Sequence, residues 1–254
     1  MSTESDKQCG TTSKLDGSTK KTRIHLSASQ LKTHRRCERL HWLQKVAKVP
    51  SEKPKAGAER GKALHKVMEY HLNGVRSLSD SLPVIPKDQR KGAQSALLNS
   101  AVLDLPGTDT EFYVEQEFWM DGVWTGFIDL LVRGGDGSVT LHDHKFTSDR
   151  RWIPTLSELQ RDPQAIIYAK AVSEFFGVDS VTCQFDYYGT RSVFWEPRRF
   201  VLTRAQIAVH WDTLKGAAVK TARNYAQSFD DTTPNFLACR DYGGCDYAHI
   251  CRSR

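Results

Sequence analysis

The sequence has 254 residues, of which 39% are hydrophobic and 26% are charged, values that are ordinary for a soluble globular protein. No stretch approaches the roughly 18 apolar residues that a membrane span needs, so we expect no membrane partner. Lysine and arginine outnumber aspartate and glutamate by 36 to 30, and this modest basic excess suits a polyanionic partner without requiring one.

The two ends of the chain differ in composition. Residues 1–22 lack the apolar core of a secretory signal, and their Ser, Thr, Gly and Lys content predicts a disordered tail. Residues 23–254 are expected to form a single domain, whose last part, 236–254, is short, polar and rich in cysteine. With no export signal, we expect a cytoplasmic, reducing compartment, which disfavours structural disulfides.

The predicted elements change from helices to strands along the chain. Apolar periodicity and a capping-box pattern predict helices in 24–46, 59–74 and 87–103, so that the part from about 57 to 105 is helical. Alternating residues and the turn signals DG and GGDG predict strands in 111–120, 123–133 and 138–147. A helix in 158–176, strands in 180–189 and 192–202, and a helix in about 203–228 follow. This order predicts an α/β fold with a mixed central sheet flanked by helices, a helical insertion and a separate cysteine-bearing end.

The third predicted strand carries a carboxylate and an ammonium where its apolar face should continue. Val139, Leu141, Asp143 and Lys145 share one face because a strand repeats every two residues, and His144 points the other way. Asp129 lies on the preceding strand among apolar neighbours. Two carboxylates on neighbouring strands would repel each other, and a divalent cation such as Mg²⁺ or Mn²⁺ would remove that penalty. Lys145 could then act on a bound water, although the alternative is a plain Asp–Lys ion pair at a strand end.

Three further side chains could join this site. His65 lies at the edge of the apolar stripe of its helix and could supply an imidazole ligand, or it could be a boundary histidine with an ordinary hydrogen bond. Gln164 and Tyr168 are four residues apart and share one helix face. That pair could contact a phosphate or the catalytic strand, or be an ordinary helix surface.

Four motifs occur in a fixed order: GKALH with His65, GFIDLLV with Asp129, LHDHKFT with Asp143 and Lys145, and QAIIY with Gln164 and Tyr168. Together they resemble the PD-(D/E)XK nuclease superfamily, and its RecB-like branch in particular, over about residues 24–252. The resemblance implies a restriction-endonuclease-like fold and a DNA exonuclease acting on ends or single strands. It implies that His65, Asp129 and Asp143 bind the metal, that Lys145 assists the water and that Gln164 and Tyr168 support DNA processing. It also suggests the His144 carbonyl as a ligand, and Glu117 resembles an acidic position often seen upstream.

Three cysteines, Cys239, Cys245 and Cys251, crowd into the last sixteen residues. Their spacing does not match the usual zinc knuckle, and a tetrathiolate site would take Cys37 as its fourth ligand. A subset of RecB-like nucleases, including AddB-type and CRISPR-adaptation proteins, places one cysteine before the nuclease motifs and three after them. This resemblance implies that Cys37, Cys239, Cys245 and Cys251 hold a 4Fe–4S cluster that ties the chain ends together. Zinc and free cysteines are the alternatives.

Basic residues gather in three places, around Cys37, directly after the third strand and near residue 200, and Trp152 and Trp195 lie beside two of them. Arg150 and Arg151, which follow Lys145 closely, are our candidates for DNA binding. The rival functions are a non-catalytic DNA-binding or interaction protein that keeps the fold and its cluster, and a small-molecule metallohydrolase. A nuclease without helicase motifs could serve recombination, CRISPR adaptation or the replication of a virus.

Overall fold

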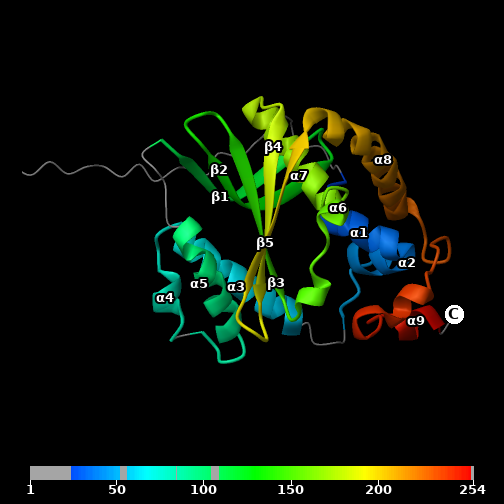
Figure 1. The fold of residues 1–254 in the computed structure, drawn as a ribbon. Coiled ribbons are helices and arrows are strands. Elements are labelled where there is room, and N and C mark those ends of the chain that lie inside the picture. The colour runs from blue at the N-terminus through cyan, green and yellow to red at the C-terminus, as the bar shows by residue number, and fades with distance from the viewer. Residues whose placement is uncertain (1–23, 52–55, 84, 104–108, 253–254) are drawn as a thin grey trace, which may run out of the picture.

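A computed structural model describes residues 24–51, 56–83, 85–103 and 109–252. The tail predicted over 1–22 lies outside the described residues. Among the described residues, one open sheet runs in the order β1-β2-β3-β4-β5 (Figure 1). Its strands are β1 (Glu111–Met120), β2 (Trp124–Arg133), β3 (Val139–Thr147), β4 (Ser180–Gly189) and β5 (Trp195–Thr203).

The sheet is mixed, as the sequence predicts. β1, β2 and β3 form an antiparallel meander, β3 and β4 are parallel, and β4 and β5 are antiparallel. A parallel pair needs a crossover connection, and here α6 (Leu156–Leu159) and α7 (Pro163–Phe176) supply it. The fold is therefore the predicted restriction-endonuclease-like α/β arrangement.

Helices cover both faces of the sheet. One face packs against α7, α1 (Ala28–Arg36) and α8 (Arg204–Arg223), in a core that includes Leu31, Ile166 and Ile207. The other face packs against α3 (Ala56–Leu72), α4 (Leu78–Ser81) and α5 (Arg90–Leu103). Figure 1 shows the second group gathered on one side of the sheet, away from α1 and α8. The predicted helical part thus forms the second layer.

Two predicted helices are divided in the structure. The helix expected in 24–46 breaks at Cys37, whose backbone is extended, into α1, α2 (Glu38–His41) and the π-helical turn η1 (Trp42–Val46). The helix expected in 158–176 breaks before Pro163, where the Asp162 side chain caps α7, because the residue before a proline avoids helical backbone.

Short helical turns complete the chain: η2 (Arg150–Trp152), η3 (Asn224–Ala226), η4 (Leu237–Gly243) and α9 (Ala248–Arg252). The last two belong to the cysteine segment, which packs against α2 and η1. Within the described part of the chain, every helix is too short or too polar to cross a bilayer.

Candidate active site

β2 and β3 separate in the middle of the sheet, and the site lies at that point. Their ladder runs from Arg133–Val139 to Leu130–His142 and goes no further. Asp129 is the next residue on β2, and its Oδ2 accepts the backbone N–H of His144 at 2.6 Å. In a continuous ladder this N–H would donate to a carbonyl of β2. Here the Asp129 carboxylate accepts it, so the backbone N–H of His144 keeps a hydrogen-bond partner.

Asp143 and Lys145 share a face of β3, as their spacing predicts, and α7 supplies their third partner. Lys145 Nζ lies 2.6 Å from Asp143 Oδ2. The Gln164 side chain donates to Asp143 Oδ1 at 2.6 Å and accepts from Lys145 at 3.3 Å. Asp143 is 1% exposed whereas the Lys145 side chain is 35% exposed. The carboxylate is therefore fixed from two sides, and the ammonium can reach a ligand.

His65, Glu115 and Asp129 form a group whose ligand atoms lie within 4.8 Å of one another. His65 Nδ1 of α3 is 3.6 Å from Asp129 Oδ2, and Glu115 comes from β1. The His65 ring also hydrogen-bonds the backbone of His144. One imidazole and two carboxylates thus converge from three elements, a donor set that suits a divalent cation.

Glu115 reaches this group through an irregular stretch of strand. Val114 packs on the face covered by α3–α5, whereas Phe118 packs on the opposite face, although both are even-numbered. Glu115 between them has a φ of 49°, a left-handed conformation that costs a non-glycine residue about 1–3 kcal/mol. On β2, Leu130 packs on the face covered by α3–α5 and Ile128 on the opposite face, so the side chains change faces at Asp129 as they do at Glu115. Because both strands change together, β1 and β2 keep the same register on either side of this point. Glu115 and Asp129 both lie at the point where the side chains of their strands change faces.

The electrostatics of this group favour a cation. Burial and the nearby Asp143 raise the pKa of Asp129 well above its ordinary value. Burial also raises the pKa of Glu115, with repulsion from Glu69 and Asp143 adding to it. Burial lowers the pKa of His65, followed by repulsion from Lys145, and so favours the neutral imidazole that binds metals. A divalent cation would relieve the carboxylate repulsion, so the residues present fit the metal that the motifs imply.

Lys145 remains an ammonium despite its surroundings. Burial opposes its charge, but attraction to Asp143 and Asp129 outweighs that effect and raises the pKa of Lys145 above its ordinary value. The site therefore combines carboxylates with one fixed cationic side chain.

The remaining predicted residues lie at different positions. Tyr168, one turn along α7 from Gln164, is buried and hydrogen-bonds the Gln164 side chain. Arg150 and Arg151 are exposed beyond β3, but Arg150 pairs with Glu196 at 3.2 Å and Arg151 pairs with Asp149 at 2.7 Å.

Glu117 lies beyond the switch in β1, opposite Phe127, and outside the group formed by His65, Glu115 and Asp129. Glu115 is the acidic residue of β1 that the sequence prediction missed. The DG signal indicates a two-residue loop, which would place Glu115 opposite Ile128. The three-residue loop over 121–123 places it opposite Asp129 instead.

A family model for the PD-(D/E)XK nuclease superfamily matches residues 25–252, nearly the whole described chain. The chain belongs to the PD-(D/E)XK nuclease superfamily. No curated protein matches it.

Solved structures resemble this PD-(D/E)XK chain in fold. A candidate exonuclease from Eubacterium rectale has a TM-score of 0.52 at 11% identity, with 91% of this chain and 88% of that one covered. The protein SSO0001 has a TM-score of 0.38 at 14% identity, with 93% and 89% covered. A phage-related exonuclease from Haemophilus somnus 129PT has a TM-score of 0.36 at 14% identity, with 80% and 94% covered. At such identities the first similarity supports the fold alone.

The reverse face of β3 in this PD-(D/E)XK fold holds a buried polar network around Asp186. Asp186 is fully buried and pairs with His142 Nδ1 at 3.0 Å. The side chains of Trp195 and Gln184 each donate to its other oxygen at 2.9 Å. A buried carboxylate is costly unless it is hydrogen-bonded in this way. The network fixes the side of β3 that backs onto Asp143 and Lys145.

The four predicted cluster cysteines come together at the chain ends. Cys251 interacts electrostatically with Cys37, Cys239 and Cys245, and Cys37, Cys245 and Cys251 share one apolar cluster. Hydrogen bonds join the same two segments, from the Arg36 side chain to the Ala238 carbonyl at 3.0 Å and from the Asn235 N–H to the Cys37 sulfur at 3.4 Å. Cys183 lies apart, in the core beneath the sheet.

Proposed function

We propose that the chain is a metal-dependent nuclease that hydrolyses DNA as an exonuclease, with Mg²⁺ or Mn²⁺ held by Asp129, Asp143 and His65 and by Glu115. The observation that carries this proposal is the convergence of His65, Glu115 and Asp129 beside the Asp143–Lys145 pair. Family membership supports nuclease chemistry. The preference for DNA ends or single strands rests on the resemblance to RecB-like proteins.

When bound, the cation would supply Lewis-acid activation of water and would stabilise charge on the phosphate. The residues do the rest. Lys145, whose side chain is 35% exposed, would bind a phosphate oxygen and orient the attacking water. Gln164 fixes both Asp143 and Lys145 by hydrogen bonds, and Tyr168 fixes Gln164. The short His144–Asp129 bond keeps the carboxylate aimed between the strands.

A cleavage assay tests this proposal. Labelled single-stranded and duplex DNA, with free and blocked ends, should be degraded with Mg²⁺ or Mn²⁺ and left intact with EDTA. Lys145→Ala should reduce the rate by about 10²–10⁴-fold. Lys170→Ala, which removes an ion pair with Glu174 elsewhere on α7, is the matched control. Full activity of Lys145→Ala, or cleavage in EDTA, would refute the mechanism, and equal cleavage of blocked ends would refute the exonuclease assignment.

We also propose that Cys37, Cys239, Cys245 and Cys251 hold a 4Fe–4S cluster, which would place the chain in the iron–sulfur group of RecB-like nucleases. The four cysteines gather at one place in the described chain. Their order, with one before the nuclease motifs and three after them, is the order that the iron–sulfur resemblance implies. A reducing compartment such as the cytoplasm belongs to this proposal, since the thiols must stay unoxidised.

A further inference from the structure

Two hollows meet at α1, on the side of the sheet that α7 and α8 cover. The first, of about 580 Å³, is lined by residues of α1, the start of α7 and α8, including Arg35, Pro163 and Lys220. The second is lined by α1, α6 and the loop before α7, and it shares Arg35 and Pro163 with the first. Figure 1 shows α6 and α1 side by side near the start of α7. We call these adjoining hollows the α1 groove.

The α1 groove carries unpaired positive charge. Arg35, Arg161 and Lys220 are exposed and make no ion pair or hydrogen bond with the residues that the structure describes. Its acidic residues are all engaged. Asp162 caps α7 and pairs with Lys32 at 2.8 Å.

The other two acids of the α1 groove are held by backbone groups. Glu158 accepts the Thr155 N–H in a capping box at 2.8 Å, and Glu38 accepts the Thr233 N–H at 3.2 Å. The cations are therefore the groups left to meet a ligand.

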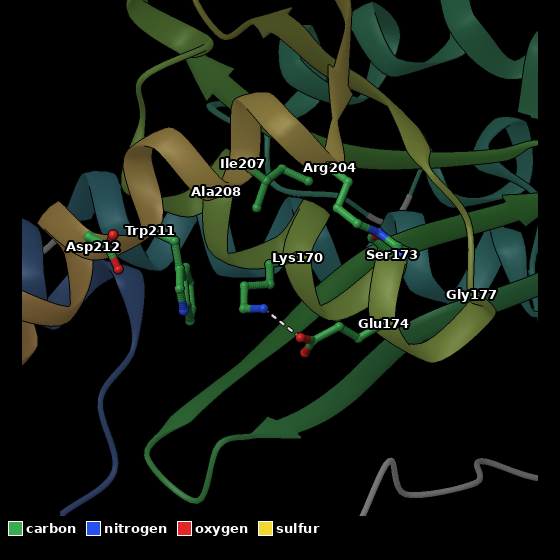
Figure 2. A pocket seen from close by; sticks show the side chains of 9 residues that line it. All are labelled: Lys170, Ser173, Glu174, Gly177, Arg204, Ile207, Ala208, Trp211 and Asp212. Atoms are coloured by element: carbon green, nitrogen blue, oxygen red, sulfur yellow. Dashed lines mark hydrogen bonds and ion pairs between the residues drawn. The ribbon is translucent and has the colours of Figure 1, made fainter.

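A third hollow, lined by residues of α7 and α8, shows the contrast (Figure 2). Its Lys170 pairs with Glu174 and lies over the Trp211 ring. Its Arg204 pairs with Asp179 at 3.5 Å. Since its cations are neutralised within the fold, that hollow offers little attraction to an anion. The α1 groove differs because Arg35, Arg161 and Lys220 have no acidic partner among the residues that the structure describes.

Asp162 connects the α1 groove to the candidate active site. It lines the groove, and its negative charge acts on Lys145. Two residues further on, Gln164 hydrogen-bonds both Asp143 and Lys145. A chain of phosphates leaving the site along the start of α7 would therefore meet Arg161 and Arg35 next, and then Lys220. Pro163, which is half-buried, lies between the two hollows and lines both.

We propose that the α1 groove binds the single-stranded nucleic acid beyond the scissile phosphate, with Arg35, Arg161 and Lys220 contacting successive phosphates. This inference rests on the proposed nuclease function and adds the path of the substrate to it. Free cations spaced along a groove match a polyanion. Nucleic acid is favoured over an acidic peptide because the groove adjoins the candidate active site through Asp162 and Gln164.

The experiment compares two double variants of the full chain. Arg35→Ala with Lys220→Ala removes two groove cations, and Lys215→Ala with Arg204→Ala removes two cations whose acids, Asp212 and Asp179, lie outside the groove. Fluorescence anisotropy with a labelled 20-nucleotide single strand, in EDTA, gives the Kd over a range of salt concentrations. We expect the groove variant to bind about tenfold or more weakly than wild type. Its slope of log Kd against log salt should fall by about 1.4, since each single-strand phosphate contact contributes about 0.7.

Cleavage of a dinucleotide with Mn²⁺ separates this proposal from the nuclease assignment, because a dinucleotide ends at the reacting phosphate. The groove variant should cleave it at the wild-type rate. Equal Kd values for the groove and control variants, with cleavage intact, would overturn the groove and leave the nuclease standing. A wild-type chain that cleaves neither substrate would overturn the proposed function instead. The same variants are titrated with labelled poly-glutamate. If the groove variant loses poly-glutamate binding but keeps DNA binding, the groove binds an acidic protein segment and not nucleic acid.

Discussion

The backbone N–H of His144 donates to the Asp129 carboxylate at 2.6 Å, across the point where β2 and β3 part. This one bond ties a side chain of one strand to the backbone of the next. It orients Asp129 toward His65 and Glu115. The geometry of the candidate metal group therefore depends on the backbone of β3 as much as on its own side chains.

Asp129→Asn separates the charge of this residue from its hydrogen bond. The amide oxygen can still accept from His144, but no anion remains for a cation. Because burial and Asp143 raise the pKa of Asp129, the metal-free variant should have a Tm equal to or above that of wild type. Mn²⁺ at a hundred times its Kd should stabilise wild type by about 2.7 kcal/mol and the variant by much less. Thermal unfolding with and without Mn²⁺ measures this, and an equal Mn²⁺ shift in both proteins would contradict the assignment.

Glu115→Gln tests the ligand that β1 contributes. Loss of one carboxylate should weaken Mn²⁺ binding by about tenfold or more, in line with the cost of disturbing a metal site. Glu117→Gln, two residues away on the same strand and outside the group, is the control and should bind Mn²⁺ as wild type does. Calorimetric titration with Mn²⁺ gives both values. Similar affinities for the two variants would remove Glu115 from the site.

Asp186→Asn tests the network behind β3. The change leaves shape intact but removes the charge that His142 and Trp195 share, which should destabilise the protein by about 1–3 kcal/mol. Because the network supports the strand carrying Asp143 and Lys145, kcat should fall more than KM changes. Steady-state cleavage kinetics, measured at temperatures below the unfolding transition, give kcat and KM separately. Asp179→Asn, at an exposed position, should leave both constants unchanged, and a wild-type kcat for Asp186→Asn would limit the network to stability.

Cys251→Ala tests the proposed cluster. Protein purified without oxygen should contain about four irons per chain with matching sulfide, and the variant should lose most of both together with several degrees of Tm. Cys183→Ala removes a thiol from the core beneath the sheet and should keep its iron. Iron and sulfide assays with metal analysis decide the matter. Zinc in place of iron, bound in wild type and lost in the variant, would replace the cluster by a zinc site.

Stability should fall as the pH drops from about 6.5 to about 4. His41 is fully buried against Tyr225, and burial, followed by repulsion from His34, lowers its pKa to about 4. In this pH range His41 binds a proton in the unfolded chain but not in the folded chain. The free energy of unfolding therefore falls by up to about 3 kcal/mol. Denaturant unfolding at pH 7 and pH 5 measures the loss. His41→Gln should show a smaller difference between the two pH values, and an unchanged difference would exclude His41.

Strand periodicity predicted the part of the site that lies on regular backbone. Asp143 and Lys145 share a face of β3 because each strand residue rotates by half a turn, and nothing in β3 disturbs this. His144 points to the reverse face, where it contacts the Tyr188 hydroxyl at 3.0 Å. Such positions follow from local chemistry alone.

The remaining features lie on irregular backbone, which residue patterns do not predict. The face switch at Glu115 depends on the left-handed φ of that residue, and the sequence EFYVEQEFWM does not distinguish it from Glu117. The turn was predicted at DG, but a three-residue loop over 121–123 set the register. The break at Cys37 was also missed, because its extended backbone is held by partners such as Asn235, far along the chain.

The contacts that hold α2 in place join residues that are far apart in the sequence. Arg39 donates to Thr232, 193 positions later, and Trp42 donates to the Gln227 carbonyl. At a synthesis rate of about 5–20 residues per second, roughly 10–40 seconds separate these partners. The segment that carries Cys37 therefore lacks these partners until Gln227 and Thr232 have been synthesised. The strands of the sheet, which end at Thr203, are made earlier and can pair before α2 is held in place.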